Sequence, residues 1–403
     1  MIGHVLGNPA LRSRDFQKLC GGSAFNSMGM SGEIVIIGIL AFEITQSSAW
    51  VGIALALYHL PMLVLGLLSG VIADWMDRRT LIRRVELAIV VNLLIFSVMI
   101  PMAPTELWLI LAFAVVSGSI RDAAFAARIS YAYDLVGSHN VVAGLSLLNL
   151  ASRCGQLIGA LVTGAVLHRF DTSAAILCLA SAHLVAFILL SRLRSAGIVA
   201  AEPRVPIGQN LRQCVHEIST NGLLLMLVMI TAVVEVFGFS FSTALPELAS
   251  HRFNVGAEGL GEMHAARAAG GILAALILTT FMGSRRRGAV YLFVICAFGV
   301  GLCLLSAANH FVMALAALIV VAGMATASDV LTQSMMQLSV PDHLRGRAMG
   351  FWVFAIGWGP VGHLELGSLS VIIGVDKALL INGVALVFVG VIAAIAVPRL
   401  RKL

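Results

Sequence analysis

Two glutamates lie deep within long apolar segments, where a carboxyl group could bind and release a proton. Glu33 shares one face of a predicted helix with Gly22, Asn26 and Gly29, because the spacing i, i+4, i+7, i+11 returns to the same side. Burial in a medium of low dielectric constant disfavours a charged carboxylate and favours its protonated form. Such a group could take up a proton on one side of a membrane and release it on the other, or bind a cationic substrate instead. The alternative is that each glutamate makes a structural hydrogen bond or lies at a water-filled edge.

Glu235 repeats this arrangement in the second half of the chain. Thr231, Glu235, Gly238 and Ser242 have the same spacing, and Glu235 lies at a matching depth in its apolar segment. Ionisable groups inside membrane segments are costly and therefore indicate function. We predict that both glutamates contribute to proton coupling or to a substrate cavity.

Further charged side chains interrupt two other apolar segments. One carries Arg121 and Asp122, and the other carries Asp329 with Gln333 one turn later. Neighbouring residues on a helix point about 100° apart, so we expect Arg121 and Asp122 to face different places. Arg121 could neutralise Glu33, Glu235 or Asp329, or it could hold an anionic substrate.

The composition shows what medium must surround these residues. Of the 403 residues, 59% are hydrophobic and 11% are charged, whereas soluble domains carry about 25% charged residues. So apolar a chain must be solvated by lipid, and its long uninterrupted runs favour helices over barrel strands. The sequence therefore predicts an all-α integral membrane protein.

The length allows twelve transmembrane helices joined by short turns. We predict spans at 18–44, 49–73, 80–101, 106–130, 139–167, 172–193, 220–246, 257–283, 287–307, 310–338, 346–373 and 377–397. The first run is a full span and continues this pattern, so no cleavable signal peptide is expected.

Basic residues define the orientation. Most of the 26 Lys and Arg residues fall in loops on one side, and only Arg169, Arg252 and Lys377 fall on the other. The positive-inside rule therefore places both termini in the cytoplasm. The net charge of +6 gathers at span ends without interleaved aromatic residues, which argues against nucleic-acid binding.

A polar stretch divides the chain nearly in half. We predict an N-terminal six-helix bundle at 1–194, a central cytoplasmic linker at 195–219 and a C-terminal six-helix bundle at 220–403. A weak internal repeat supports pseudo-symmetric halves, since the segments that begin at Val136 and Val340 align. Duplicated halves are common in transporters, whose substrate site lies between them.

The turn between the second and third spans carries a motif. It resembles the signature turn of the major facilitator superfamily of secondary transporters, G-x-x-x-D-R-x-G-R-R. The matching residues are Gly70, Asp74, Arg78 and Arg79. This resemblance implies a conformational role, in which Asp74 makes a charge contact with neighbouring helices and the arginines help to hold the outward-open state. The corresponding turn after Phe281 keeps arginines but lacks the aspartate.

A second motif precedes the eleventh span. The segment Val340–Gly350 resembles V-P-x-x-x-R-G-R-x-x-G of bacterial drug and siderophore exporters, with the enterobactin-exporter-like group as the best match. The resemblance implies a transporter in the bacterial inner membrane that exports small amphipathic molecules in exchange for protons. The oligomeric state is open, and a monomer is the default expectation. It also implies that spans 1, 4, 7 and 10 line a central cavity, which would place Glu33 and Glu235 on facing sides.

The fifth span combines polar and small residues. Its glycines permit close helix packing, and Arg153 could pair with the other half. We assign the residues Asn149, Arg153, Gly155 and Gly159 to packing or to the interface between halves. The histidines of the spans, including His183, are interpreted as packing residues more often than as proton relays.

Other functions are less well supported. An uptake carrier for an anionic metabolite, with Arg121 and Arg153 as clamps, is the main alternative. No nucleophile, nucleotide-binding or metal-ligand motif is found in the sequence, so neither an enzyme nor a metal or other cofactor is expected. The six cysteines form no C-x-x-C pair and are interpreted as buried apolar residues. A membrane scaffold would have no use for matched buried charges.

Overall fold

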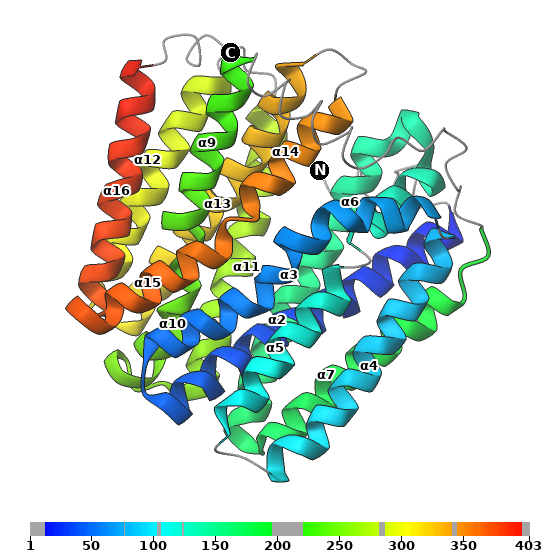
Figure 1. The fold of residues 1–403 in the computed structure, drawn as a ribbon, viewed down its shortest axis with the longest axis horizontal. Helices are drawn as coiled ribbons and strands as arrows, with labels where there is room; N and C mark the ends of the chain where they lie inside the picture. Colours follow the sequence, from blue (N-terminus) through cyan, green and yellow to red (C-terminus); the bar gives the residue numbers. More distant parts are fainter. Residues whose placement is uncertain are drawn as a thin grey trace. The chain divides into compact units, whose positions relative to one another are not determined.

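A computed structural model describes residues 13–75, 77–102, 106–122, 125–195, 221–281, 287–340 and 345–396. Within these ranges the secondary structure is helical, without strands, which confirms the all-α prediction for the described residues. The chain divides into two compact units (Figure 1). The first contains Met1–Ala200 together with Leu245–Ala269, and the second contains Ala201–Ala244 and Gly270–Leu403.

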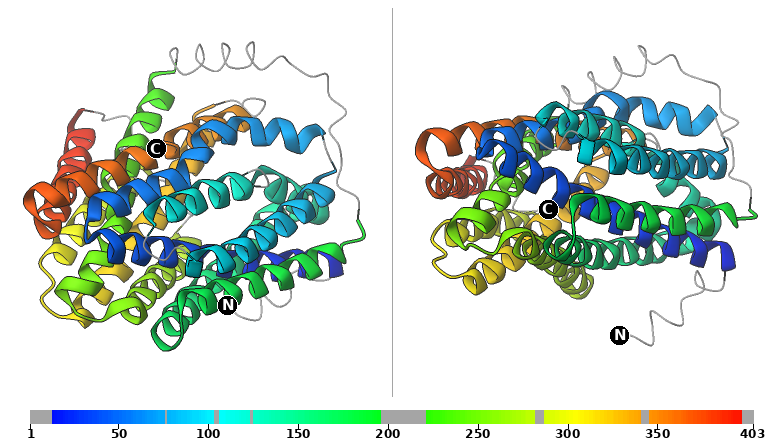
Figure 2. Two further views of the ribbon diagram at one scale, coloured as in Figure 1. Left: turned by 60° about the horizontal axis from the view of Figure 1, so that its bottom comes forward. Right: turned by 90° about the horizontal axis from the view of Figure 1, so that it is seen from below.

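The first unit is a bundle of long helices. They are α2 (Arg14–Thr45), α3 (Ser48–Trp75), α4 (Arg78–Met102), α5 (Leu107–Asp122), α6 (Phe125–Arg169) and α7 (Thr172–Ser191). Helix α2 packs on α6 and α7, and α4 runs beside α7 (Figures 1 and 2). Residues 245–269 add the short segments α10 (Leu245–Glu247) and η3 (Leu248–Arg252) and the beginning of α11 (Gly256–Phe281).

The added segment contacts the end of α2 and the start of α3. Ser48 Oγ donates a hydrogen bond to Glu247, His251 Nε2 lies 2.8 Å from Gln46 Oε1, and the His251 ring meets Phe42 edge-on. Gln46 ends α2 with a left-handed backbone, at φ 51°. Polar and aromatic contacts therefore join residues that are about two hundred positions apart.

The second unit is also helical. Besides the rest of α11, it contains α9 (Gly222–Phe237), η2 (Phe239–Thr243), α12 (Arg287–Ser306), α13 (Phe311–Leu338), α14 (Arg345–Ile356), α15 (Gly359–Ile373) and α16 (Val375–Ala396). Helices α12 and α16 pack side by side (Figure 1). The glycines Gly299 and Gly383 meet at this contact, where a Cβ atom on either would strike the backbone of the other helix.

Eight helices in the described residues are long and apolar enough to cross a membrane. Helix α4 illustrates why such helices suit lipid, because Val91, Ile95 and Val98 are exposed while Leu93 and Phe96 are buried. A helix satisfies its own backbone hydrogen bonds, so apolar side chains can face hydrocarbon without stranding polar backbone groups. The chain is therefore a multi-pass membrane protein.

Two spans are interrupted where we expected continuous helices. The predicted span 220–246 contains α9, the 3₁₀ segment η2 and the first residues of α10, and the helical path continues beyond it through the π-helix η3 to Arg252. The predicted span 346–373 breaks between α14 and α15, just before Pro360. Proline lacks the N–H that would continue the ladder and is favoured in the first turn of a helix, so α15 begins there.

The opposite correction applies to the predicted turn between 130 and 139. Helix α5 ends at Asp122, and α6 runs without a break from Phe125 to Arg169. The glycine at 137 does not end the helix, and no proline lies nearby to remove a backbone donor. A glycine within a polar stretch was therefore too weak a signal for a turn.

Side chains from three helices hold the end of α7. Arg83 of α4 donates from Nε to the carbonyl of Leu190 at 3.0 Å and from Nη2 to the carbonyls of Ser191 and Leu193 at 2.6 Å. Tyr131 of α6 donates to the carbonyl of Ser195 at 2.7 Å. The last carbonyls of a helix have no partner within the helix, so these donors supply what α7 lacks.

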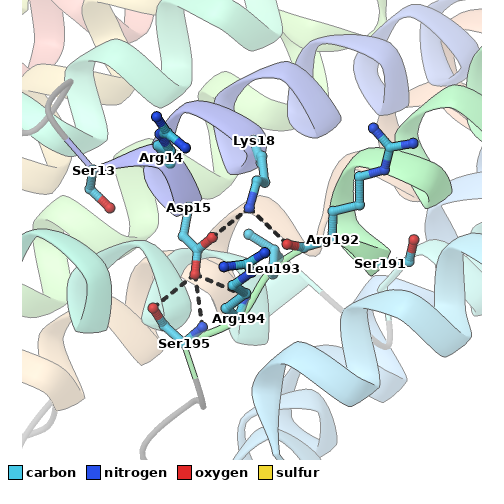
Figure 3. Close-up of a pocket in the computed structure, with 9 residues that line it drawn as sticks. All are labelled: Ser13, Arg14, Asp15, Lys18, Ser191, Arg192, Leu193, Arg194 and Ser195. Carbon is cyan, nitrogen blue, oxygen red and sulfur yellow. Dashed lines mark hydrogen bonds and ion pairs between the residues drawn. The ribbon is translucent and has the colours of Figure 1, made fainter.

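Asp15 of α2 completes this arrangement (Figure 3). One of its oxygens accepts hydrogen bonds from the backbone N–H groups of Arg194 and Ser195 and from the Ser195 hydroxyl, at 2.8–2.9 Å. The other accepts from Lys18, whose ammonium also donates to the carbonyl of Arg192 at 2.7 Å. These groups line a cavity of about 630 Å³. The predicted linker from 196 onward lies outside the described residues.

We predict that Arg83→Met destabilises the protein because it removes the side-chain donor to the carbonyls of Leu190, Ser191 and Leu193. The expected loss is about 2 kcal/mol, typical of hydrogen bonds from a charged donor. Arg84→Met is the matched control, because Arg84 is the next residue and is exposed. Thermal unfolding in detergent should show a lower midpoint for the first variant only. Equal midpoints for both would contradict this account.

Candidate functional site

Glu33 lies in the middle of α2 and is buried, with 3% of its surface exposed. Its Oε2 atom accepts a hydrogen bond from the Tyr58 hydroxyl of α3 at 3.0 Å. Its Oε1 atom lies 3.7 Å from Nε2 of His183 on α7. The carboxyl group therefore sits between two helices of its own unit and has a titratable neighbour on each side.

A second buried carboxyl group, that of Glu86 on α4, has 0% exposure. Its Oε1 atom accepts from Asn26 Nδ2 at 2.6 Å and from Arg128 Nη2 at 2.9 Å. Its Oε2 atom lies 3.0 Å from His183 Nδ1. Glu86 thus contacts α2, α6 and α7 at once, and the Arg128 guanidinium compensates its charge.

His183 lies between these two carboxyl groups. Its ring is 1% exposed and packs against Gly29, where even a single methyl group would overlap it. Nδ1 faces Glu86, while Nε2 has no hydrogen-bond partner among the described residues and faces Glu33. His183 is therefore a buried polar residue with a carboxyl group on each side, and whether it packs only or also relays protons stays a prediction.

Arg121 and Asp122 do not point to different places, and that expectation was wrong. Arg121 Nη2 pairs with Asp122 Oδ1 at 2.9 Å, although the two are adjacent on α5. The guanidinium also lies over the Tyr58 ring, 4.4 Å from its centroid, in cation–π geometry. A long arginine side chain can reach the carboxylate of the next residue, so the angle between the Cα–Cβ bonds does not fix where its charge lies.

The face of α2 that carries Gly22, Asn26, Gly29 and Glu33 points into its own unit. Gly22 meets Leu190 of α7, Gly29 meets His183, and Asn26 meets Glu86. The shared face predicted from the spacing therefore exists as one row of contacts. Whether it also meets a substrate stays a prediction.

In the second unit, Glu235 is half-buried on α9. A Cβ atom built on Gly359 of α15 would lie 3.2 Å from its Oε1 atom, so the carboxyl group faces the break between α14 and α15. Asp329 and Gln333 are half-buried on α13, one turn apart. Their roles in coupling or in a substrate cavity stay predictions.

The arginines of the turn motif have defined partners. Arg78 Nη1 donates to both carboxylate oxygens of Asp134 on α6, at 2.9 and 2.8 Å. Arg79 donates to the carbonyl of Arg194 at 3.0 Å and lies 3.4 Å from Asp77. Gly70 and Asp74 belong to α3 but fall in a stretch whose side chains lie outside the described part of the chain.

The fifth-span residues divide into two kinds. Gly155 and Gly159 of α6 lie against the backbone of α2 at Ala24 and Met28, where a Cβ atom would clash. Asn149 is exposed, and Arg153 Nη1 donates to Gln156 within its own helix at 3.4 Å. The two glycines thus allow α2 and α6 to approach closely.

We predict energetic coupling between Arg78 and Asp134. Their side chains are 13% and 8% exposed, so removing either leaves a poorly solvated charge. A double-mutant cycle with Arg78→Ala and Asp134→Ala should give a coupling energy of about 1–3 kcal/mol in thermal or denaturant unfolding. Strictly additive effects would show that the ion pair contributes nothing to stability.

Comparison with known proteins identifies the fold. The chain resembles a variant of the nucleoside transporter NupG, with 13% identity, a TM-score of 0.79 and coverage of 95% of this chain and 99% of the other. It also resembles a bacterial homologue of the human lysosomal transporter Spinster, in an inward-facing and unoccupied conformation, with 13% identity, a TM-score of 0.73 and coverage of 96% and 98%. An auto-inhibited POT family peptide transporter gives 12% identity, a TM-score of 0.77 and coverage of 96% and 97%.

No curated protein sequence matches the chain. The family model of the transmembrane secretion effectors matches residues 8–402, which is nearly the whole sequence. The chain therefore belongs to the transmembrane secretion effector family and is a membrane transporter of the major facilitator type.

Proposed function

We propose that this transporter exports small amphipathic molecules, such as a drug-like compound or a siderophore, in exchange for protons. The observation that carries the proposal is Glu33, a carboxyl group buried in the middle of a membrane-spanning helix. In lipid surroundings such a group is stable when it is protonated or paired. The family description, secretion effector, supports outward movement.

The proposal includes the finer organisation. Twelve spans form bundles at 1–194 and 220–403, joined by a linker at 195–219, and both termini lie in the cytoplasm of a bacterial cell. The transporter works as a monomer in the inner membrane. Rocking of the bundles opens a central site to each side in turn, and we assign Glu235, Asp329 and Gln333 to the C-terminal side of that site. The turn motif stabilises one of the two states.

Uptake of an anionic metabolite is the weaker alternative. It requires Arg121 to offer a free positive charge, but its guanidinium pairs with Asp122 and lies over the Tyr58 ring. A transported anion would have to compete with both contacts. The nucleoside and peptide substrates named for the similar structures belong to those proteins and do not select a cargo here.

The test uses purified protein in liposomes that contain a pH-sensitive dye. A panel of cationic dyes and iron-chelating siderophores is added, and proton movement driven by each compound is recorded. We expect Glu33→Gln to abolish this movement, because an amide cannot exchange a proton. Glu43→Gln is the matched control, since Glu43 lies on the same helix and is exposed.

Two outcomes would contradict the proposal. If proton movement persists in Glu33→Gln at the wild-type rate, the carboxyl group is structural. If Arg121→Ala abolishes binding of anionic compounds while proton coupling remains, uptake of an anion becomes the better interpretation. Glu235→Gln, tested in the same way, shows whether the second half shares the coupling.

A further inference from the structure

The two buried carboxyl groups of the first unit are arranged alike around His183. In each, one oxygen is held by donors, namely Tyr58 for Glu33 and Asn26 with Arg128 for Glu86. The other oxygen faces a ring nitrogen, at 3.7 Å from Nε2 for Glu33 and at 3.0 Å from Nδ1 for Glu86. A structural ion pair with a histidine requires only one carboxylate. A proton path through the imidazole requires a carboxyl group next to each ring nitrogen.

We propose that Glu86 and His183 form a second proton-binding site, and that His183 passes protons between Glu33 and Glu86. This inference rests on the proposed proton coupling at Glu33. It places the whole path inside the first unit, on α2, α4 and α7.

The path runs along the helix axes. Asn26, which binds Glu86, lies two turns before Glu33 on α2, a rise of roughly 10 Å. Glu86 is two turns inside α4, whose first residue is Arg78. Glu86 therefore lies nearer than Glu33 to the end of the bundle where α2 and α4 begin, the end that we propose is cytoplasmic. His183 bridges the two depths.

The proton transfer balances without an outside reactant. The O–H bond on Glu33 Oε1 breaks as an N–H bond forms on His183 Nε2, and the Nδ1–H bond breaks as an O–H bond forms on Glu86 Oε2. Neutral imidazole can accept at one nitrogen while it donates from the other. A shift of under about 1 Å would bring Nε2 and Oε1 to hydrogen-bond distance.

The charges around the ring also favour one bound proton. The charged groups are the carboxylates Glu33, Glu86 and Asp122 and the guanidiniums Arg121 and Arg128. With His183 neutral, the cluster has one negative charge in excess. An unpaired charge is costly in a buried, weakly polarisable setting, so uptake of a single proton neutralises the cluster as a whole.

Gly29 offers a way to disturb the ring without changing any titratable group. A Cβ atom at this position would overlap Nε2 and Cδ2 of His183, so Gly29→Ala must displace the imidazole. Gly22→Ala is its control on the same face, since the three atoms nearest to its Cβ atom would all belong to the side chain of Leu190 and not to His183. Asn92→Ala is a control for buried polarity on α4, because it removes a hydrogen bond to Ser117 outside the cluster.

The first experiment needs no substrate. Purified protein in lipid is stepped between about pH 5 and about pH 9, a range that brackets imidazole titration, and infrared difference spectra are recorded over time. The Glu33 carboxyl band is identified by its loss in Glu33→Gln. We expect His183→Asn, Glu86→Gln and Gly29→Ala to slow the response of this band by roughly tenfold or more, as for loss of a proton-transfer group.

The controls Gly22→Ala and Asn92→Ala should respond at the wild-type rate. If His183→Asn folds and its Glu33 band responds at the wild-type rate, the relay is overturned. If His183→Asn does not fold, the same comparison is made with Gly29→Ala. The proposed function is tested separately, by measuring whether added compounds drive proton movement through the wild-type protein. If the variants slow the Glu33 band but no added compound moves protons through the wild type, the relay is supported and the proposed proton-coupled transport is wrong.

A second measurement, in the liposome assay, distinguishes a relay role of His183 from a structural role. Tetraphenylphosphonium serves as the cationic probe, and its counterflow exchange requires no net proton transfer. If the wild type transports this probe, His183→Asn should lose proton-coupled flux by about tenfold or more while counterflow persists. Equal loss of both would indicate that His183 merely supports the fold.

Discussion

The structure of the first unit depends on the neutralisation of Glu86 in a place that water does not reach. A carboxylate with no exposed surface must be paired or protonated, and here three helices supply its partners: Asn26 from α2, Arg128 from α6 and His183 from α7. These contacts tie α4 to α2, α6 and α7 in addition to the apolar packing between the helices. The glycines Gly155 and Gly159 then allow α2 and α6 to approach until their backbones touch.

The sequence revealed part of this site through a simple signal. Glu33 stands alone in a long apolar run, so its burial and its shared face with Asn26 could be predicted from spacing. Glu86 gives no such signal, because it follows Arg83 and Arg84 within the first turns of α4 and looks like a solvated charge at the end of a span. The sequence does not indicate a role for His183 either, because a single histidine in an apolar helix is also compatible with packing. Only the fold brings these residues together.

The wrong expectations have physical reasons as well. Helix geometry places the Cβ atoms of Arg121 and Asp122 about 100° apart, but a guanidinium at the end of a long side chain can reach a neighbouring carboxylate. A helix break such as the one before Pro360 depends on whether the freed backbone groups find other hydrogen-bond partners. The amino-acid composition of the segment does not predict this. Eight apolar helices in the described residues are long enough to cross a membrane; the count of twelve spans rests on the sequence and on the resemblance to a known family.

A proton path within one unit bears on the kind of cargo. When the cluster around His183 loses its proton, the carboxylates outnumber the guanidiniums by one, and that excess charge is stabilised by any cation that approaches Glu33. A cationic substrate and a proton then compete for the same negative charge, which is the requirement for exchange of one for the other. An anionic substrate would instead be repelled by the deprotonated cluster and attracted only through Arg121, whose charge is already matched by Asp122. If protons pass through this cluster as we propose, its charge balance favours a cationic cargo over an anionic one.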